Sequence, residues 1–121
     1  MGKYLILIYG DEQQWDTMSE AEQRRIDAGH VAFNGRAGSA VIDGGALAPT
    51  ATSTSLRMGP AGPGSPLTVT DGPFLETKEA LGGFYLLEAK DLDEVISLAN
   101  LLPEVGAGHS GVEIRPLRTW D

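Results

Sequence analysis

Two short segments of the sequence are apolar on both of their alternating faces. Residues 3–9 (KYLILIY) and residues 81–89 (LGGFYLLEA) carry Leu, Ile, Tyr and Phe at odd and even positions alike. Because the side chains of a β-strand alternate between the two faces of its sheet, such segments are typical of strands buried on both sides. We therefore predict two neighbouring central strands, and the fold has to cover both faces of the sheet that they form.

Two amphipathic helices are predicted on one side of these strands. Ser19 with Glu22 three residues later forms a capping-box signature, and apolar residues at helical spacing then predict a helix over residues 20–37. Asp91 with Glu94 marks the start of a second helix, whose apolar residues recur at spacings of three and four. Each helix therefore has one apolar face with which to cover the sheet.

The remaining strands complete the predicted order. Residues 41–47 and 112–117 are expected as strands, and residues 52–58 and 66–70 as a hairpin joined by the Gly/Pro-rich loop GPAGPGS. The whole chain, residues 1–121, has the length of one domain. We predict an α+β fold, a ferredoxin-like βαββαβ arrangement with an inserted β-hairpin.

Two helices can cover only one face of that sheet, so the second face needs another cover. A second copy of the chain, packed sheet to sheet, is the simplest candidate because most soluble oligomers are symmetric homodimers. A monomer with an exposed apolar sheet is disfavoured. We therefore expect a homodimer.

Composition narrows the function classes. The net charge is −8 and the basic residues are scattered, so the surface repels phosphate backbones and nucleic-acid binding is not expected. The longest apolar run, YLILIY, is too short to span a bilayer, and no membrane anchor is expected. The chain has no cysteine and only two histidines, so we predict neither disulfides nor a metal site or cofactor, and a cytoplasmic location.

His30 is the first candidate for catalysis. It follows Ile26 and precedes Phe33 on the apolar stripe of the first predicted helix, facing the sheet. A histidine in this position serves either as an acid/base group or simply as a hydrogen-bonding partner for a carbonyl. His109, in the segment GAGHSG, is interpreted as a surface residue.

The segment Asp71-Gly72-Pro73-Phe74 predicts a stiff corner before the second central strand. The Asp carboxylate can close an Asx-turn, Gly tolerates positive φ and Pro restricts the residue before it. Phe74 is expected to pack as the anchor of this corner. The corner has either this structural role alone or the additional role of holding Asp71 at the mouth of a pocket.

Four further residues are predicted to contact a small-molecule ligand. Tyr9 ends the first strand and can point its phenol into a cavity. Lys78 either binds an anionic group or belongs to a solvated charged face. Phe33 and Phe74 complete this set.

Three segments carry a resemblance to a known family. VTDGPFLETKEALGGFYLLEAKDLDEVISLA, KYLILIYGDE and GVEIRPL resemble the YCII-related family in its DGPF branch, over essentially the whole chain. The resemblance implies a dimeric α+β barrel, a shape shared with small-molecule enzymes such as muconolactone isomerases. It also implies a catalytic pair, a helical histidine that maps onto His30 and a loop aspartate that maps by position onto Asp71.

The resemblance implies no particular reaction, and three hypotheses remain open. The first is a small-molecule enzyme that uses His30 as acid/base in a cavity between helices and sheet. The alternative is a non-catalytic ligand-binding or regulatory module, since some relatives are associated with sigma-factor systems. The third is a structural dimer, in which side chains would fill the cavity.

Overall fold

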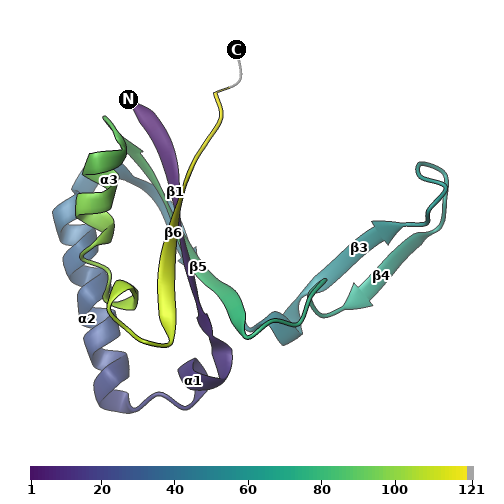
Figure 1. Ribbon diagram of the computed structural model, residues 1–121, viewed down its shortest axis with the longest axis horizontal. Coiled ribbons are helices and arrows are strands. Elements are labelled where there is room, and N and C mark those ends of the chain that lie inside the picture. The colour runs from purple at the N-terminus through teal and green to yellow at the C-terminus, as the bar shows by residue number, and fades with distance from the viewer. Residues whose placement is uncertain (120–121) are drawn as a thin grey trace.

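Both doubly apolar segments lie inside one antiparallel sheet. The computed structural model describes residues 1–119 and has a four-stranded sheet in the order β2-β5-β1-β6 (Figure 1). The inner strands are β1 (Gly2–Asp11) and β5 (Glu79–Ala89), and the outer strands are β2 (Val41–Ala46) and β6 (Ser110–Pro116). The predicted α+β class and the adjacency of the two central strands are confirmed.

The register of β1 and β5 decides which side chains share a face. Ile6 pairs with Tyr85, while the next pair along, Leu5 with Leu86, points to the other face. Ile6 is completely buried under the helices, whereas Leu5 and Leu86 remain partly exposed. Within one chain, only one face of the sheet is therefore fully covered.

The first long helix, α2 (Glu20–Ala37), has the predicted bounds. The Ser19 hydroxyl accepts the Glu22 backbone N–H at 3.1 Å, which satisfies one of the free donors at the helix start. The helix ends at Gly38, whose φ of 53° is in the left-handed region that glycine tolerates. Within residues 1–119, no helix combines the length and apolarity needed to cross a membrane.

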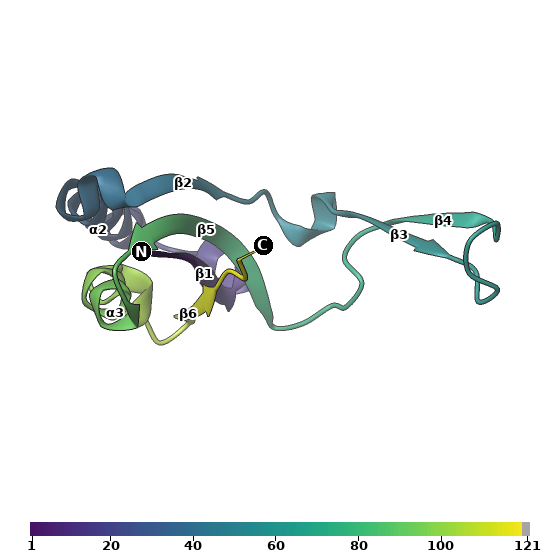
Figure 2. The same cartoon turned by 90° about the horizontal axis from the view of Figure 1, so that it is seen from above.

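The second long helix, α3 (Leu92–Ala99), lies on the same side of the sheet as α2 (Figures 1 and 2). The Asp91 carboxylate caps it by accepting the Glu94 N–H at 2.9 Å. Its apolar face and that of α2 close the core against the sheet. The fully buried large side chains of this core are Ile6, Phe33, Leu87, Val95 and Leu102.

The segment after β1 forms the short helix α1 (Glu12–Asp16). Its N-terminus is capped by the Asp11 carboxylate, which accepts the Gln13 N–H at 3.0 Å. This helix places the Trp15 indole directly on the backbone of the sheet. Within residues 1–119, three short 3-10 helices complete the helical elements: η1 (Gly38–Ala40), η2 (Thr50–Thr52) and η3 (Pro103–Val105).

The predicted hairpin is present as a separate two-stranded sheet. Strands β3 (Thr54–Met58) and β4 (Leu67–Asp71) pair with each other and with no other strand of the described chain. They extend away from the helices and the main sheet (Figures 1 and 2). We call residues 54–71 the arm, and the rest of the fold the body.

Candidate functional site

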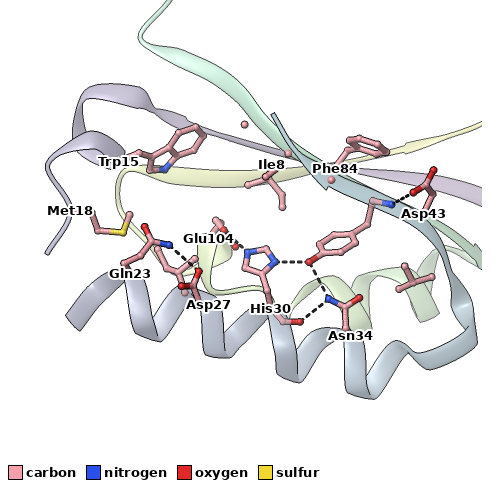
Figure 3. Close-up of a pocket in the computed structure, with 18 residues that line it drawn as sticks. Ile8, Trp15, Met18, Gln23, Asp27, His30, Asn34, Asp43, Phe84 and Glu104 are labelled. Carbon is pink, nitrogen blue, oxygen red and sulfur yellow. Dashed lines mark hydrogen bonds and ion pairs between the residues drawn. The ribbon is translucent and has the colours of Figure 1, made fainter. Parts of the chain in front are cut away.

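A cavity of about 660 Å³ lies between α2 and the main sheet (Figure 3). Its walls come from α1, α2, β1, β2, β5 and η3. This open volume speaks against the hypothesis of a purely structural dimer with a filled interior. Residues that line the cavity include Ile8, Trp15, Met18, Gln23, Ile26, Asp27, His30, Asn34, Asp43, Phe84, Tyr85 and Glu104.

Two glycines allow aromatic rings to pack against the strands beside this cavity. A Cβ on Gly44 would lie 2.8 Å from the Tyr85 ring and 2.9 Å from the Phe84 carbonyl oxygen. A Cβ on Gly82 would overlap the Trp15 ring, and Gly82 also lies where the register of β1 and β5 shifts. The bulge in β5 and the close approach of the Trp15 ring thus occur together at Gly82.

His30 projects from the middle of α2, and both of its ring nitrogens are engaged (Figure 3). Nδ1 lies 2.6 Å from the Tyr85 hydroxyl on β5, and Nε2 lies 2.7 Å from a carboxylate oxygen of Glu104 on η3. The imidazole and the Tyr85 ring are stacked with centroids 5.8 Å apart. Three separate elements therefore hold the imidazole.

The chemistry of the partners determines the direction of these hydrogen bonds. An ionised Glu104 carboxylate can only accept, so His30 Nε2 donates to it. In the neutral imidazole, Nδ1 then has no proton and accepts the Tyr85 O–H. Asn34 Nδ2 donates to the Tyr85 oxygen at 3.3 Å and to the His30 carbonyl at 2.9 Å. The chain of donors runs from Asn34 through Tyr85 and His30 to Glu104.

The environment of Tyr85 favours its neutral form. Burial raises the pKa of this phenol, and the negative charge of Glu104 raises it further. The hydrogen bond from Asn34 acts in the opposite direction, but the net shift is upward from the usual value of 10.0. Tyr85 therefore retains its proton at neutral pH and can donate it.

Glu104 is a buried carboxylate. Only 9% of its side chain is exposed, and its second oxygen, Oε1, finds no hydrogen-bond partner within residues 1–119. A buried carboxylate is costly unless it is paired. The contact with His30 therefore fixes the imidazole and at the same time stabilises the Glu104 charge.

The cavity is acidic. Asp27, Asp43 and Glu104 line it, whereas none of the lysines and arginines of the described chain does so. Trp15 and Tyr85 contribute aromatic surface. An anionic group in this cavity would meet like charges without a compensating cation.

The other predicted site residues lie elsewhere. Tyr9, Asp71 and Lys78 line a second, open depression between the base of the arm and the adjoining ends of β1 and β5. Phe33 is fully buried against the Tyr85 ring, with centroids 4.6 Å apart, and is not among the residues lining the first cavity.

Within one chain, the described residues do not bring His30 and Asp71 together. Both ring nitrogens of His30 contact other side chains, and Asp71 lines the separate depression. The dyad with Asp71 is therefore not formed in this structure. Glu104 occupies the position beside His30 that the sequence analysis assigned to Asp71.

The prediction that Phe74 anchors the DGPF corner is wrong. Its side chain is 59% exposed, and the guanidinium carbon of Arg57 lies 4.2 Å from the centroid of its ring. The positive φ expected for Gly72 is present, at 101°, and its N–H donates to the Ser53 carbonyl at 2.6 Å. The hydrogen bond from the Gly72 N–H to Ser53, rather than a buried ring, holds the corner.

His109 was predicted at the surface, and this prediction is wrong as well. Only 11% of its side chain is exposed. Its Nε2 lies 2.7 Å from a Glu22 carboxylate oxygen and its Nδ1 lies 2.7 Å from the Ser110 hydroxyl. The Ser110 oxygen also accepts the Trp15 indole N–H at 2.9 Å.

Three residues around His30 were not predicted from the sequence: Tyr85, Asn34 and Glu104. Asn34 had a usable signal, because it follows His30 by four residues and shares its face of the helix. Tyr85 and Glu104 lie 55 and 74 residues from His30 along the chain, and no local pattern connects them to it. No group of three or more His, Asp or Glu side chains suited to a metal ion occurs within residues 1–119.

Comparisons with known proteins agree with the resemblance at the level of the family. The YCII-related domain matches residues 2–121. The uncharacterized protein R00369 of Rhizobium meliloti (strain 1021) is 34% identical over 122 residues, covering 97% of this chain and 93% of that protein.

A solved structure aligns with this chain over most of the length of both proteins. It is the 5-chloro-2-hydroxyhydroquinone dehydrochlorinase (TftG) of Burkholderia phenoliruptrix AC1100, in complex with 2,5-dihydroxybenzoquinone. The identity is 22% and the TM-score 0.47, over 98% of this chain and 93% of the other.

Proposed function

This chain belongs to the YCII-related domain family, and we propose that it is a small-molecule enzyme in which His30 transfers a proton through Tyr85. The sequence TDGPF at residues 70–74 supports a finer placement in the DGPF branch of the family. The observation that carries the proposal is the polarised chain Tyr85–His30–Glu104, which lines a cavity large enough for a small molecule.

The route of the proton follows from the occupied nitrogens of His30. A ligand can reach the imidazole directly only by displacing Tyr85 or Glu104. Tyr85, in contrast, lines the cavity, and its oxygen retains capacity to accept a further hydrogen bond beside that from Asn34. Tyr85 is therefore the catalytic residue that contacts the ligand, and His30 acts behind it.

In the proposed proton transfer, two protons move in one concerted step. An acidic group of the ligand donates its proton to the Tyr85 oxygen while the phenolic proton of Tyr85 moves to His30 Nδ1. The products are a ligand anion, a neutral Tyr85 and an imidazolium paired with the Glu104 carboxylate. The reverse shift returns a proton to the ligand, as general acid–base catalysis requires.

Glu104 and Asn34 are positioning residues in this mechanism. Glu104 keeps the proton of His30 on Nε2 and stabilises the imidazolium, which is the role of a buried carboxylate beside a catalytic histidine. Asn34 orients the Tyr85 oxygen through its 3.3 Å hydrogen bond. The raised pKa of Tyr85 keeps its hydroxyl protonated between turnovers.

The charges of the cavity define the class of ligand. With three carboxylates and no lysine or arginine of the described chain on its walls, the cavity favours an uncharged or cationic molecule. Trp15 supplies a flat wall for an unsaturated or aromatic ligand. Lys78, predicted to bind an anionic group, lines the other depression instead.

The test begins with binding. Uncharged, cationic and anionic aromatic fragments are screened against the protein by ligand-observed NMR, with Trp15 fluorescence as a second readout. Uncharged or cationic fragments are expected to bind and anionic ones are not. Preferential binding of anionic fragments that quench Trp15 would contradict the ligand class.

The second stage tests catalysis on the fragments that bind. Fragments with an acidic C–H group are incubated in D₂O, and wild-type protein is expected to accelerate isotope exchange at that group. His30→Gln and Tyr85→Phe should each lower the rate by about 100-fold or more. His109→Gln, which alters a similar histidine pair outside the cavity, should retain the exchange. Fragments that bind tightly without any exchange above the His30→Gln level would support the non-catalytic ligand-binding module instead.

A further inference from the structure

The three carboxylates of the cavity differ in how far the protein already satisfies them. Asp43 Oδ1 accepts the N–H of the next residue at 2.8 Å, and Asp27 Oδ1 accepts the side-chain amide of Gln23 at 2.9 Å. Glu104 offers one oxygen to His30, while its Oε1 has no hydrogen-bond partner within residues 1–119. No lysine or arginine of the described chain forms a salt bridge with any of the three.

The free oxygen of Glu104 makes this negative charge costly. Only 9% of the Glu104 side chain is exposed, and Glu104 lines the cavity from η3. A buried polar atom without a partner calls for a specific explanation, and a buried charge is stable only when it is paired. With a neutral His30, the cavity supplies no positive charge of its own, so a cation bound in it would lower this cost.

Trp15 offers a fixed surface for such a cation. Its ring lies over two glycines, Gly10 on β1 and Gly82 on β5, because a Cβ on either one would overlap the ring. Its indole N–H donates to the Ser110 hydroxyl at 2.9 Å. In Figure 3 the ring lies across the cavity from the part of α2 that carries Asp27. The face of a tryptophan ring is the best aromatic partner for a cation.

We propose that the ligand is a cation and that its positively charged nitrogen binds between the Trp15 ring and the Asp27 carboxylate. This inference rests on the proposed function, in which an acidic C–H group of the same ligand gives its proton to Tyr85. Asp27 is solvent-exposed and lines the cavity, so it can meet a ligand at the open side. The hydrogen bond from Gln23 orients its carboxylate. Asp27 is therefore a specificity-determining residue.

The proposed proton transfer gives an independent reason for a cationic ligand. When an uncharged ligand loses a proton to Tyr85, it becomes an anion beside Asp27 and Asp43, and like charges oppose its formation. A ligand with a charged nitrogen next to the C–H group changes instead from +1 to zero. The electron pair left on carbon is then stabilised by the adjacent positive nitrogen, while the phenolic proton moves to His30.

The first experiment compares two probes of the same shape. Phenacyltrimethylammonium carries a permanent positive charge, and neopentyl phenyl ketone has a carbon atom in place of the charged nitrogen. Titrations followed by ligand-observed NMR at low salt should show the cation binding about 10-fold more tightly. Added NaCl should reduce this preference because it screens the carboxylates. Equal affinities, or tighter binding of the neutral ketone, would overturn the proposal.

Substitution of Asp27 locates the preference. Asp27→Asn removes the charge and nearly keeps the shape, so it should weaken binding of the cation by about fivefold and leave the ketone unchanged. The matched control is Glu20→Gln, which removes one charge from the same helix at a side chain that is 93% exposed and does not line the cavity. This control should keep the full preference.

Two outcomes with these variants would contradict the assigned site. Equal losses in Asp27→Asn and Glu20→Gln would reduce the preference to an effect of net charge. Equal weakening of both probes by Asp27→Asn would give Asp27 a structural role only. Amide NMR signals of α2 verify that each variant is folded.

Isotope exchange separates this inference from the proposed function, because both probes have a CH₂ group next to a carbonyl. In D₂O, wild-type protein should accelerate exchange at this group more for the cation than for the ketone. Preferential binding of the cation without exchange would support the cation site and contradict the proposed enzyme. Exchange of both probes with equal affinity would contradict the cation site and leave the proton transfer through Tyr85 intact.

Discussion

His30 and His109 occupy nearly the same polar arrangement in two parts of the molecule. Each presents Nε2 to a carboxylate oxygen at 2.7 Å, from Glu104 in one case and from Glu22 in the other. Each also presents Nδ1 to a hydroxyl group. Judged by partners and distances alone, both histidines would qualify as acid–base groups.

The difference lies in what the hydroxyl faces. The Tyr85 hydroxyl beside His30 belongs to a side chain that lines the cavity. The Ser110 hydroxyl beside His109 accepts the Trp15 indole N–H, and Ser110 lines neither this cavity nor the depression at the base of the arm. Access to a cavity, rather than the histidine–carboxylate pair itself, distinguishes a candidate catalytic group from a structural connection.

Removing His30 should have the largest effect on stability. His30→Ala leaves the Glu104 carboxylate, of which only 9% is exposed, buried without its partner. We expect a loss of about 3 kcal/mol in the free energy of unfolding, measured by urea denaturation at pH 7. Combining His30→Ala with Glu104→Gln removes the buried charge and should recover part of this loss. A single variant that loses less than about 1 kcal/mol would contradict the importance of the pair.

Substitutions at the two glycines beside the cavity should affect different ends of it, because Gly44 faces the Tyr85 ring and Gly82 faces the Trp15 ring. In Gly44→Ala the new methyl group meets the Tyr85 ring and the Phe84 carbonyl oxygen, and the backbone oxygen cannot easily move. We expect a cost of about 2 kcal/mol together with shifted NMR signals of the His30 imidazole. Gly82→Ala should cost a similar amount but change the fluorescence of Trp15 and leave the imidazole signals nearly unchanged. Identical spectral changes in both variants would show that the two ends are not independent.

Removing His109, the histidine outside the cavity, should cost less stability than removing His30. His109→Ala exposes a Glu22 carboxylate that is already 33% accessible to solvent and can be rehydrated. We expect a loss of about 1 kcal/mol in the free energy of unfolding. The Ser110 hydroxyl also loses a partner, so Trp15 fluorescence should change. A loss equal to that of His30→Ala would erase the distinction between the two histidines.

The smallest expected effect is a change of stability at alkaline pH, and it is specific to Tyr85. The pKa of Tyr85 is raised above 10.0 in the folded protein, so folding stabilises its protonated form. This stabilisation is complete below pH 10.0 and is lost as the pH rises through the raised pKa, because the unfolded chain then binds fewer protons. Tyr85→Phe should therefore lose less stability than wild type above pH 10.0.

The absorbance of ionised tyrosine provides the measurement. Of the three tyrosines in the chain, one should ionise later than the others in the folded protein. Tyr85→Phe should remove this late component. A late component that persists in the variant would assign the raised pKa to another tyrosine.

The helices, strands and candidate His30 could be predicted because their signals are local. The α2 helix has its predicted bounds, since the Ser19 cap and the apolar spacing lie within one segment. The arm was recognised from two short strands around a Gly/Pro-rich loop. Helix α1 and the exposed Phe74 were missed because their environment depends on contacts with distant segments.

The sequence by itself determined the order of elements, the doubly apolar strands and the histidine on the inner face of α2. Only the tertiary structure decided which residues meet that histidine. Tyr85 and Glu104 reach His30 across 55 and 74 positions because the register of the sheet and the place of η3 set their distances. Periodicity is a property of neighbouring residues, whereas a hydrogen bond between remote side chains requires the packed fold to bring them within 3 Å.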